Sequence, residues 1–353
     1  MPGSVIKLTD RSVITAEPAA DARPGAESGG AEKWQEILAD LVTEPKELLQ
    51  ILGLETLLPA LDPAPLSFPM KVPRPFIERM ERGNPDDPLL RQVLPLHLEL
   101  TPDLAPLDPL EEARFNPLAG LLHKYRGRVL LTVAPHCAVH CRYCFRRDFP
   151  YGDNTPGRAQ WQPVLDYISA DPEITEVIFS GGDPLAAGDR HLGWLVGQLE
   201  SIPHLRRLRI HTRTPVVIPQ RVTPELLHWL TDTRLQTVMV LHCNHPREID
   251  DTLRQALGRL TGRGITLLNQ SVLLRGVNDD VECLNTLSES LFDHGVLPYY
   301  LHLLDPVGGV AHFDVPQAQA LDLMSRLRGV LPGYLVPRLV REIPGRDAKT
   351  ILG

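Results

Sequence analysis

The chain has 353 residues, a formal net charge of −8 at pH 7 and 5 cysteines. A chain of this length can bury the core of one large domain, or of a domain with an appendage. Its acidic balance argues against a nucleic-acid partner, and no apolar run approaches the ~20 residues that cross a bilayer. Residues 1–12 also lack the apolar core of a secretory signal. We therefore expect a soluble, cytoplasmic protein with neither nucleic acid nor membrane as a partner.

The amino-terminal part of the chain differs in composition from the rest. Residues 1–31 are small and polar, which predicts a disordered tail. Helical periodicity begins near Trp34, and prolines concentrate in residues 59–117, so that residues 32–124 are predicted to form a helical and proline-rich wrapping segment.

Residues 125–333 alternate strand-like and helix-like stretches. Strands are predicted at 128–134, 175–180, 206–212, 236–242, 265–274 and 297–304, with helices at 159–169, 189–201, 223–233, 247–263 and 281–294. Repeated β–α units of this kind form a parallel sheet with helices outside, and six units suit an open, partial β/α barrel of the α/β class. A last strand and a lysine are expected in residues 334–353.

Three cysteines follow the first of these strands. Cys137, Cys141 and Cys144 form the sequence CAVHCRYC. A cubane iron–sulfur cluster normally takes four thiolates, one per iron, so three would leave one iron open to a non-protein ligand. With His136 or His140 as a fourth ligand, the same spacing fits a structural zinc knuckle, although no second CxxC pair is present. The odd number of cysteines disfavours a disulfide framework.

Polar residues also lie on, at the ends of, or directly after the other predicted strands. In chain order they are Ser180, Gly181, Gly182 and Asp183, then His211, Thr212 and Arg213, then His242, then Asn269, Gln270 and Ser271, and finally Asp305. A single such residue is more often a capping or loop residue than a ligand. Because chemistry collects at the carboxyl ends of the strands in barrel folds, their shared position indicates a functional site.

These sequences carry a resemblance. The cysteine loop resembles that of the radical S-adenosylmethionine enzymes. The stretches SGGDP, RTPVVIPQRVTPEL, NHP and NQSVLLRGVND resemble the lysine 2,3-aminomutase family in order and spacing, over residues 70–353. Within that family, FIERMERGNPDDPLLRQVLP, LLHKYRGR, CRYCFRRDFPY, PYYLHLLDPVGGVAHF and YLVPRLVREIPGRDAKT are similar to the short bacterial branch that supplies β-lysine for modification of elongation factor P.

The resemblance implies a partial barrel that holds a 4Fe-4S cluster, S-adenosylmethionine and pyridoxal phosphate. The implied activity is L-lysine 2,3-aminomutase, forming β-lysine as the (R) enantiomer. A deoxyadenosyl radical removes hydrogen from the β-carbon of lysine held as an imine of pyridoxal phosphate, the amino group shifts, and hydrogen returns. The implied partners are L-lysine, an external reductant such as flavodoxin or ferredoxin, and elongation factor P with its lysyl-ligase, and a homodimer is compatible with the resemblance.

The resemblance also implies roles for single residues, matched position by position. It implies that the cluster is held by Cys137, Cys141 and Cys144, pyridoxal phosphate by Lys349 and Arg128, S-adenosylmethionine by Ser180, Gly181, Gly182, Asp183, His242 and Gln270, and substrate by Arg146, Asp305 and Glu342. The chain departs from the family at two places. A glycine-rich loop before Lys349 is replaced by residues 345–348, and Glu342 stands where the family has an aspartate.

The acidic residues bear on the substrate. An unpaired buried charge costs several kcal/mol, so Asp305 and Glu342 favour a cationic side chain, and a glutamate 2,3-aminomutase would need the opposite charge. Other substrates that stay open are arginine and a lysine already attached to the factor. A rival from another class is a zinc- or cluster-binding docking protein without catalysis, against which the pair of Lys349 and Arg128 stands. Cys243 is expected to be a small buried hydrophobe.

Overall fold

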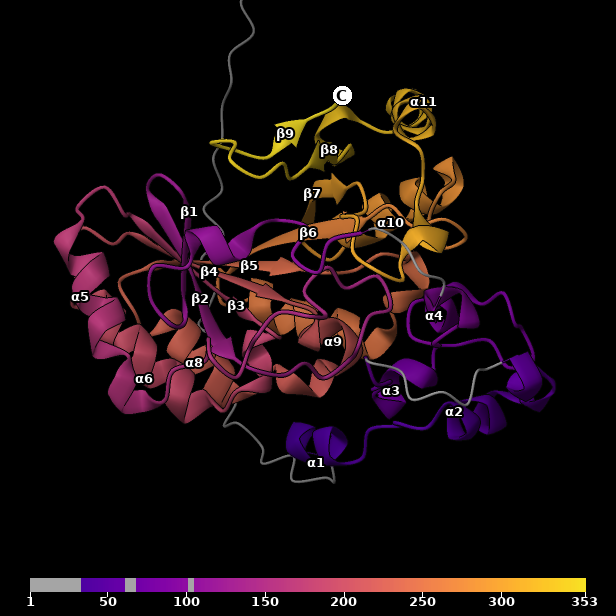
Figure 1. Ribbon diagram of the computed structural model, residues 1–353, viewed down its shortest axis with the longest axis horizontal. Helices are drawn as coiled ribbons and strands as arrows, with labels where there is room; N and C mark the ends of the chain where they lie inside the picture. Colours follow the sequence, from indigo (N-terminus) through magenta and orange to yellow (C-terminus); the bar gives the residue numbers. More distant parts are fainter. Residues whose placement is uncertain (1–32, 61–67, 101–104) are drawn as a thin grey trace, which may run out of the picture. The chain divides into compact units, whose positions relative to one another are not determined.

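A computed structural model of the chain describes residues 33–60, 68–100 and 105–353. The predicted tail therefore lies outside the described residues, as do parts of the proline-rich segment. The described residues contain a nine-stranded sheet whose strand order follows the chain (Figure 1). Its strands are β1 (Leu121–Tyr125), β2 (Arg128–Ala134), β3 (Glu176–Gly181), β4 (Arg207–Thr212), β5 (Gln236–Leu241), β6 (Thr266–Val272), β7 (Val296–His302), β8 (Arg338–Arg341) and β9 (Thr350–Ile351).

The sheet is mostly parallel and open. Strands β2 to β8 pair in parallel, each with the next, whereas β1 and β9 pair antiparallel at the two edges. All six predicted strands are present as β2 to β7, so the predicted α/β class with an open parallel sheet is confirmed. The structure adds a seventh parallel strand, β8, which the sequence placed in the carboxy-terminal segment, and β1, which was not predicted.

Helices connect the parallel strands. They are α5 (Gln162–Ala170), α6 (Asp189–Glu200), α7 (Thr214–Val217), α8 (Pro224–Thr231), α9 (Asp251–Thr261), α10 (Val281–Phe292) and α11 (Gln317–Arg328). Side chains cap three of them, because Thr223, Asp250 and Asp280 each accept a backbone N–H from the first turn. Figure 1 shows α5, α6, α8 and α9 along one face of the sheet. None of the helices in the described ranges is long and apolar enough to cross a membrane.

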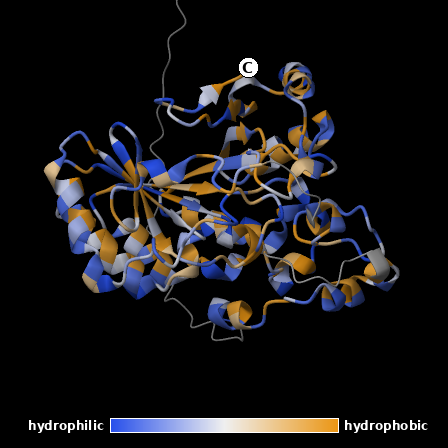
Figure 2. Ribbon diagram, in the orientation of Figure 1, coloured by the Kyte–Doolittle hydropathy of each residue, from blue (hydrophilic) through white to orange (hydrophobic). Residues whose placement is uncertain are grey.

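The alternation of side chains along each strand separates the core from the site. Val177 and Phe179 of β3 and Ile210 of β4 belong to the main core cluster, which packs against the helices. Because successive side chains point to opposite faces of a sheet, Ser180 and His211 lie on the other face. We call this the inner face. Figure 2 shows the strands mostly orange, while the helices carry blue residues between orange ones.

The amino-terminal segment packs against the loops at one end of the sheet. It contains α1 (Trp34–Ala39), α2 (Pro45–Leu52), α3 (Arg74–Ile77) and α4 (Pro88–Arg91). A second core cluster joins their apolar side chains to Ala138 and Val139 of the cysteine loop and to Val217 and Ile218. The short 3-10 turns are η1 (Glu55–Ala60), η2 (His97–Leu100), η3 (Glu112–Phe115), η4 (Arg158–Gln160), η5 (Pro184–Ala186), η6 (Pro219–Arg221), η7 (Pro246–Glu248), η8 (Ala311–Phe313) and η9 (Gly333–Leu335).

Candidate active site

The cysteine loop follows β2, where the sequence predicted it. Cys137, Cys141 and Cys144 are free thiols of intermediate exposure. Burial raises the pKa of Cys137 well above its usual range and that of Cys144 to about 11. The guanidinium of Arg213, at the end of β4, donates through Nη1 to Sγ of Cys141 at 2.9 Å. The loop therefore presents three thiols with a buried cation beside one of them.

The amino-terminal segment holds the backbone of this loop. The N–H of His140 donates to the carbonyl of Lys71 at 3.0 Å, and the N–H of Arg142 donates to the carbonyl of Gln92 at 2.9 Å. The side chain of Gln92 also accepts from Nη2 of Arg213 at 2.7 Å. The amino-terminal segment thus fixes the backbone of the cysteine loop and the arginine beside it.

Two glycines bring the loop after β3 onto the cysteine loop. A Cβ at Gly182 would lie 2.5 Å from the carbonyl oxygen of His136, and one at Gly181, whose φ is +121°, would lie 2.6 Å from that of Ala134. The N–H of Gly182 donates to the carbonyl of Ala134 at 2.9 Å, and the N–H of Asp183 donates to the carbonyl of His136 at 3.0 Å. The close backbone approach that the glycines predict is therefore made to the cysteine loop itself.

Asp183 is committed to protein donors. Its carboxylate accepts from Oγ1 of Thr212 at 2.7 Å and from the backbone N–H groups of Leu185, Arg213 and Thr214 at 3.0, 2.7 and 2.9 Å. These bonds tie the loop after β3 to the end of β4. The structure thus gives the side chain of Asp183 a structural part in the site.

Histidines and an amide line the inner face. Gln270 on β6 and His242 after β5 lie together, with 2.8 Å between Nε2 of each. Burial lowers the pKa of His242 to about 3, so the neutral ring accepts the amide hydrogen. The Nε2 atoms of His211 on β4 and His302 on β7 are buried without a hydrogen-bond partner among the described residues. Buried polar atoms normally have a partner, so this face fits a polar ligand.

A chain of alternating charges crosses the site. Nζ of Lys349 lies 2.6 Å from Oε2 of Glu342, whose Oε1 lies 2.8 Å from Nζ of Lys124. Lys124 in turn lies 3.7 Å from Oε1 of Glu112, which pairs with Arg146 at 2.7 Å. The first of these contacts is local, because β8 and β9 form a hairpin with Arg341 opposite Thr350, and Glu342 and Lys349 come next in the register.

The pKa values of the two carboxylates that are expected to meet a substrate ammonium are shifted in opposite directions. Burial raises the pKa of Asp305 to about 7, and the negative charge of Glu342 adds to this rise. Burial acts on Glu342 in the same sense, but Lys349 and Lys124 outweigh it and hold its pKa below the usual range. Glu342 is therefore held in its ionised form, whereas burial and Glu342 favour the protonated form of Asp305.

Arg128 lies at the start of β2, at the other end of the strand from the cysteines. Its guanidinium carbon is 4.5 Å from the centre of the Tyr125 ring. Burial raises the pKa of Tyr125, with Glu342 as the next cause and Arg128 opposing it. Tyr125 thus stands beside both Arg128 and Glu342, which relates Arg128 to the Lys349 end of the charge chain.

Sequence reasoning missed Glu112, Lys124 and His302. Glu112 is buried and comes from η3, in an irregular segment without periodicity. His302 could have been found from its place on β7, since it follows Tyr300 by two residues and therefore shares its face. Cys243 is 1% exposed within the main core, as predicted.

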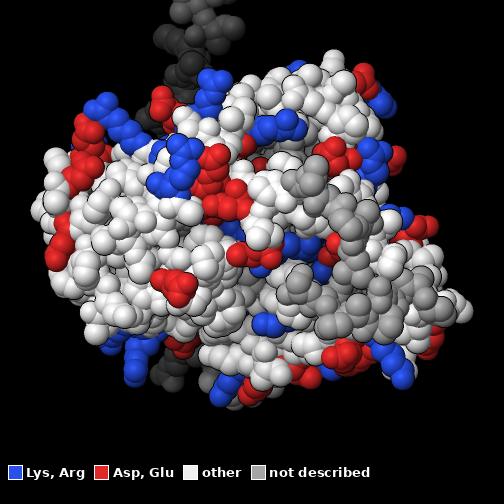
Figure 3. Space-filling view, in the orientation of Figure 1, with Lys and Arg blue, Asp and Glu red and all other residues white. Residues whose placement is uncertain are grey.

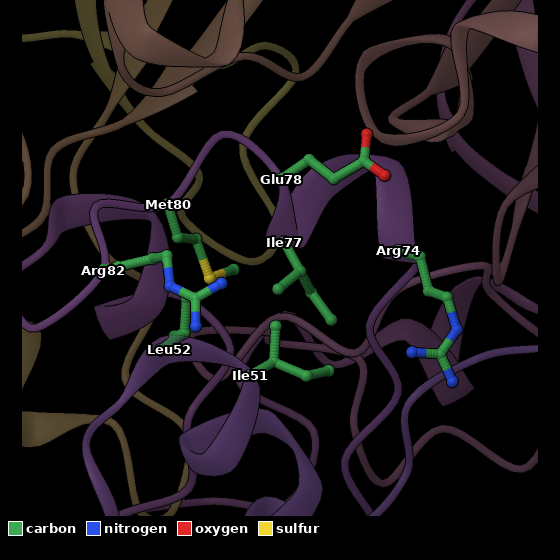
Figure 4. A pocket seen from close by; sticks show the side chains of 7 residues that line it. All are labelled: Ile51, Leu52, Arg74, Ile77, Glu78, Met80 and Arg82. Carbon is green, nitrogen blue, oxygen red and sulfur yellow. The ribbon is translucent and has the colours of Figure 1, made fainter.

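Figure 3 shows acidic and basic side chains intermingled near the middle of one face of the molecule, where the surface is hollowed. A separate pocket of about 350 Å³ belongs to the amino-terminal segment, and Figure 4 shows Ile51 and Ile77 pointing toward one another in it. It is lined by Ile51, Leu52, Arg74, Ile77, Glu78, Met80 and Arg82, none of which is a predicted site residue. The charge chain and not this pocket is the candidate site.

No group of three His, Cys, Asp or Glu side chains in the described ranges is arranged to surround one metal ion. A zinc knuckle needs such a group. The thiolates of a cubane cluster bind different irons, so three cysteines that hold a cluster need not converge on one point.

Comparison with known proteins gives relatives over almost the whole chain. No protein-family model matches. The chain is 53% identical over 326 residues to the L-lysine 2,3-aminomutase of Escherichia coli, covering 91% of this chain and 94% of that protein. It is 52% identical over 322 residues to the enzyme of the same name from Haemophilus influenzae, covering 91% and 95%.

A more distant relative is the L-lysine 2,3-aminomutase of Clostridium subterminale, 38% identical over 286 residues, with 80% of this chain and 68% of that protein covered. Among solved structures, Streptococcus suis SuiB bound to S-adenosylmethionine is similar with a TM-score of 0.48 and 13% identity, over 64% of this chain and 52% of that one. That structural similarity is too low to support a functional comparison. The sequence identities are high and span nearly the full length, and the chain belongs to the L-lysine 2,3-aminomutase family.

Proposed function

We propose that this protein converts L-lysine into β-lysine with a 4Fe-4S cluster, S-adenosylmethionine and pyridoxal phosphate as cofactors. The observation that carries the proposal is the 53% identity to the Escherichia coli L-lysine 2,3-aminomutase over 91% of the chain. The charge chain supports it, because Arg146 lies at one end and Glu342 and Lys349 at the other. Binding an amino acid with a cationic side chain requires a positive group for its carboxylate and a negative group for its side chain.

Residues of this chain fit the three cofactors. Cys137, Cys141 and Cys144 are free thiols on one loop, and they would hold the cluster. The unpartnered Nε2 atoms of His211 and His302 fit a polar ligand against the inner face. When bound, the cluster supplies an electron that cleaves S-adenosylmethionine to a radical, and pyridoxal phosphate supplies the carbonyl that carries the amino group.

Lys349 is the residue that would hold pyridoxal phosphate, with Arg128 toward its phosphate group. Guanidinium geometry suits a phosphate, and the ring of Tyr125 holds Arg128 in place. Lys349 is 21% exposed and reaches the site from the β8–β9 hairpin. Gly345, at φ +76°, supplies the turn of the loop before it, so one glycine meets the conformational need for which the family uses several.

Substrate recognition falls to three residues. Arg146 would pair with the α-carboxylate, and Asp305 with Glu342 would neutralise the distant ammonium. The carboxylate of Glu342 contacts Lys124 through Oε1 and Lys349 through Oε2. Once Lys349 holds the cofactor, Oε2 of Glu342 can face a substrate cation. Ionised Asp305 is favoured by the same cation, because an opposite charge nearby lowers the pKa of a buried carboxyl.

The finer parts of the proposal rest on the resemblance to the short bacterial branch of the family. They are the (R) configuration of the product, its use by the lysyl-ligase of elongation factor P, reduction by a flavodoxin or ferredoxin, and a cytoplasmic location. The alternative of arginine as substrate is set aside by the names of the relatives, which all specify lysine.

The test is anaerobic reconstitution with iron, sulfide and pyridoxal phosphate, followed by incubation with S-adenosylmethionine, a reductant and L-lysine. Chiral chromatography should show (R)-β-lysine without stoichiometric loss of S-adenosylmethionine. The Cys137→Ala/Cys141→Ala/Cys144→Ala variant should lose iron and activity, and Lys349→Ala should keep its iron and lose bound pyridoxal phosphate. Steady release of deoxyadenosine without β-lysine would show a different substrate and refute the proposal.

A further inference from the structure

Glu112 is a buried carboxylate without an assigned part in the reaction. Its side chain is 4% exposed. Its Oε2 accepts from Nε of Arg146 at 2.8 Å, and its Oε1 accepts from Nη2 at 2.7 Å. A bidentate pair of this kind fixes both the position and the plane of a guanidinium. Arg146 therefore has one orientation in this structure, and Glu112 sets it.

The backbone that presents Glu112 is strained. Glu111, directly before it, has φ 49°, the one positive φ among the non-glycine residues in the described ranges. Asp108 holds the turn, since its carboxylate accepts the N–H of Glu112 at 2.9 Å and the N–H of Ala113 at 3.1 Å. Left-handed backbone at a non-glycine residue costs on the order of 1–3 kcal/mol, and such residues cluster at functional sites.

The pairing leaves one edge of Arg146 for a ligand. A guanidinium has five N–H donors, arranged so that a carboxylate can bind the edge of Nε and Nη2 or the edge of Nη1 and Nη2. Glu112 takes the first edge. Nη1 gives one of its two hydrogens to Oγ of Ser180 at 3.0 Å, so Nη1 and Nη2 each keep one N–H for a ligand.

The charges around Arg146 allow a second carboxylate. Two carboxylates on one guanidinium would repel each other, but Nζ of Lys124 lies 3.7 Å from Oε1 of Glu112. Lys124 is 12% exposed, so solvent screens this contact only weakly. The whole charge chain, Lys349, Glu342, Lys124, Glu112 and Arg146, has three cations and two anions, an excess of one positive charge that complements one α-carboxylate.

We propose that Glu112 is the positioning residue of the substrate-carboxylate site, holding one edge of Arg146 so that the other edge receives the α-carboxylate of lysine. The inference rests on the proposed function, because it takes Arg146 as the residue that binds this carboxylate. Glu112 acts only through Arg146 and does not touch the substrate.

The test compares two ligands that differ in the carboxylate alone. Equilibrium binding of L-lysine and of cadaverine, which is lysine without its carboxylate, is measured on the anaerobic holoenzyme. Glu112→Gln leaves one acceptor and turns an NH₂ group toward the guanidinium. One charge-assisted bidentate contact corresponds to a loss of roughly tenfold to hundredfold, so lysine binding should weaken by that factor, while cadaverine binding stays unchanged.

Two further variants keep the result interpretable. Glu173→Gln removes a matched carboxylate from an exposed pair with Arg126, where Nε donates at 2.9 Å, and should change neither affinity. Glu112→Asp keeps the charge but is shorter by a methylene, so it should fold even where Glu112→Gln does not and should weaken lysine binding by an intermediate factor.

The outcomes separate the inference from the proposed function. A wild-type protein that binds lysine no better than cadaverine would refute the role of Arg146, and the inference with it. A wild-type protein that prefers lysine, with an unchanged preference in both Glu112 variants, would overturn the inference alone. Equal weakening of lysine and cadaverine would show a purely structural role for Glu112 and would also overturn it.

Discussion

Replacing Gly182 with alanine tests whether contact between two loops shapes the cysteine loop. The new Cβ would lie 2.5 Å from O, 2.6 Å from C and 2.8 Å from N of His136. These are backbone atoms, so no side chain can rotate away. Ordinary van der Waals contact begins at 3.4 Å, so the loops must separate by about 0.9 Å, the difference between 3.4 and 2.5 Å.

The cost has two parts. Overpacking a well-packed site costs about 1–3 kcal/mol. The shift also stretches two backbone hydrogen bonds, from Gly182 to Ala134 at 2.9 Å and from Asp183 to His136 at 3.0 Å, each worth about 0.5–1.5 kcal/mol. We expect Gly182→Ala to destabilise the folded protein by about 2–6 kcal/mol and to displace the cysteine loop.

The assay pairs two measurements on the same preparation. Iron and sulfide per chain after anaerobic reconstitution report the cysteine loop, and thermal unfolding reports the fold. Gly197→Ala in α6 is the matched control, because no heavy atom lies within 4 Å of its added Cβ, and a helix gains up to about 1 kcal/mol from the change. A Gly182→Ala protein with wild-type iron content and melting temperature would show that the two loops are not coupled in this way.

Three further predictions concern charge. Burial and Glu342 raise the pKa of Asp305 to about 7, and a lysine ammonium favours its ionised form, so KM for lysine should fall as pH rises from 6 to 8, and Asp305→Asn should abolish this dependence. The pKa of Asp305 is higher in the folded protein than in the unfolded chain, so its protonated carboxyl stabilises the fold below pH ~4, and this stabilisation is lost as the pH rises through 7. The difference in melting temperature between wild type and Asp305→Asn should therefore change over this range. A difference that stays constant with pH would contradict the prediction. Glu99 is 3% exposed and pairs with Arg142 and Arg147, so Glu99→Gln leaves two buried arginines without a counter-charge. This substitution should lower the free energy of unfolding, measured with denaturant, by about 3–5 kcal/mol, whereas the exposed Glu173→Gln should lower it by less than about 1 kcal/mol. Equal losses would contradict the reasoning.

The sequence predicted the features that depend on local pattern. Strands β2 to β7 follow from apolar runs bounded by turns, and the place of Cys137 follows from the rule for the carboxyl ends of parallel strands. It did not predict β1, which has five residues and follows a proline-dense segment. Its seven-residue neighbour β2 was found because its apolar run is longer.

The charge chain depends on contacts that no local pattern reveals. Glu112 and Arg146 are 34 residues apart, and Lys124 and Glu342 are 218 apart. Glu112 lies in a 3-10 turn whose sequence has no period to read, so its burial became visible only in the fold. Asp183 was correctly placed at the end of β3, but three of its four protein donors, on Thr212, Arg213 and Thr214, lie about 30 residues further along the chain, and only the fold brings them to it.

The bonds from Lys71 and Gln92 to the backbone of the cysteine loop have a thermodynamic consequence. Any ligand that binds the ordered loop more tightly than the disordered one stabilises, by the same free energy, every segment that must be in place for the loop to be ordered. Residues 68–99 supply no thiol, but they belong to that group because the carbonyls of Lys71 and Gln92 accept hydrogen bonds from the backbone of the cysteine loop. We therefore expect a cluster bound by the three cysteines to slow proteolysis of residues 68–99 as well.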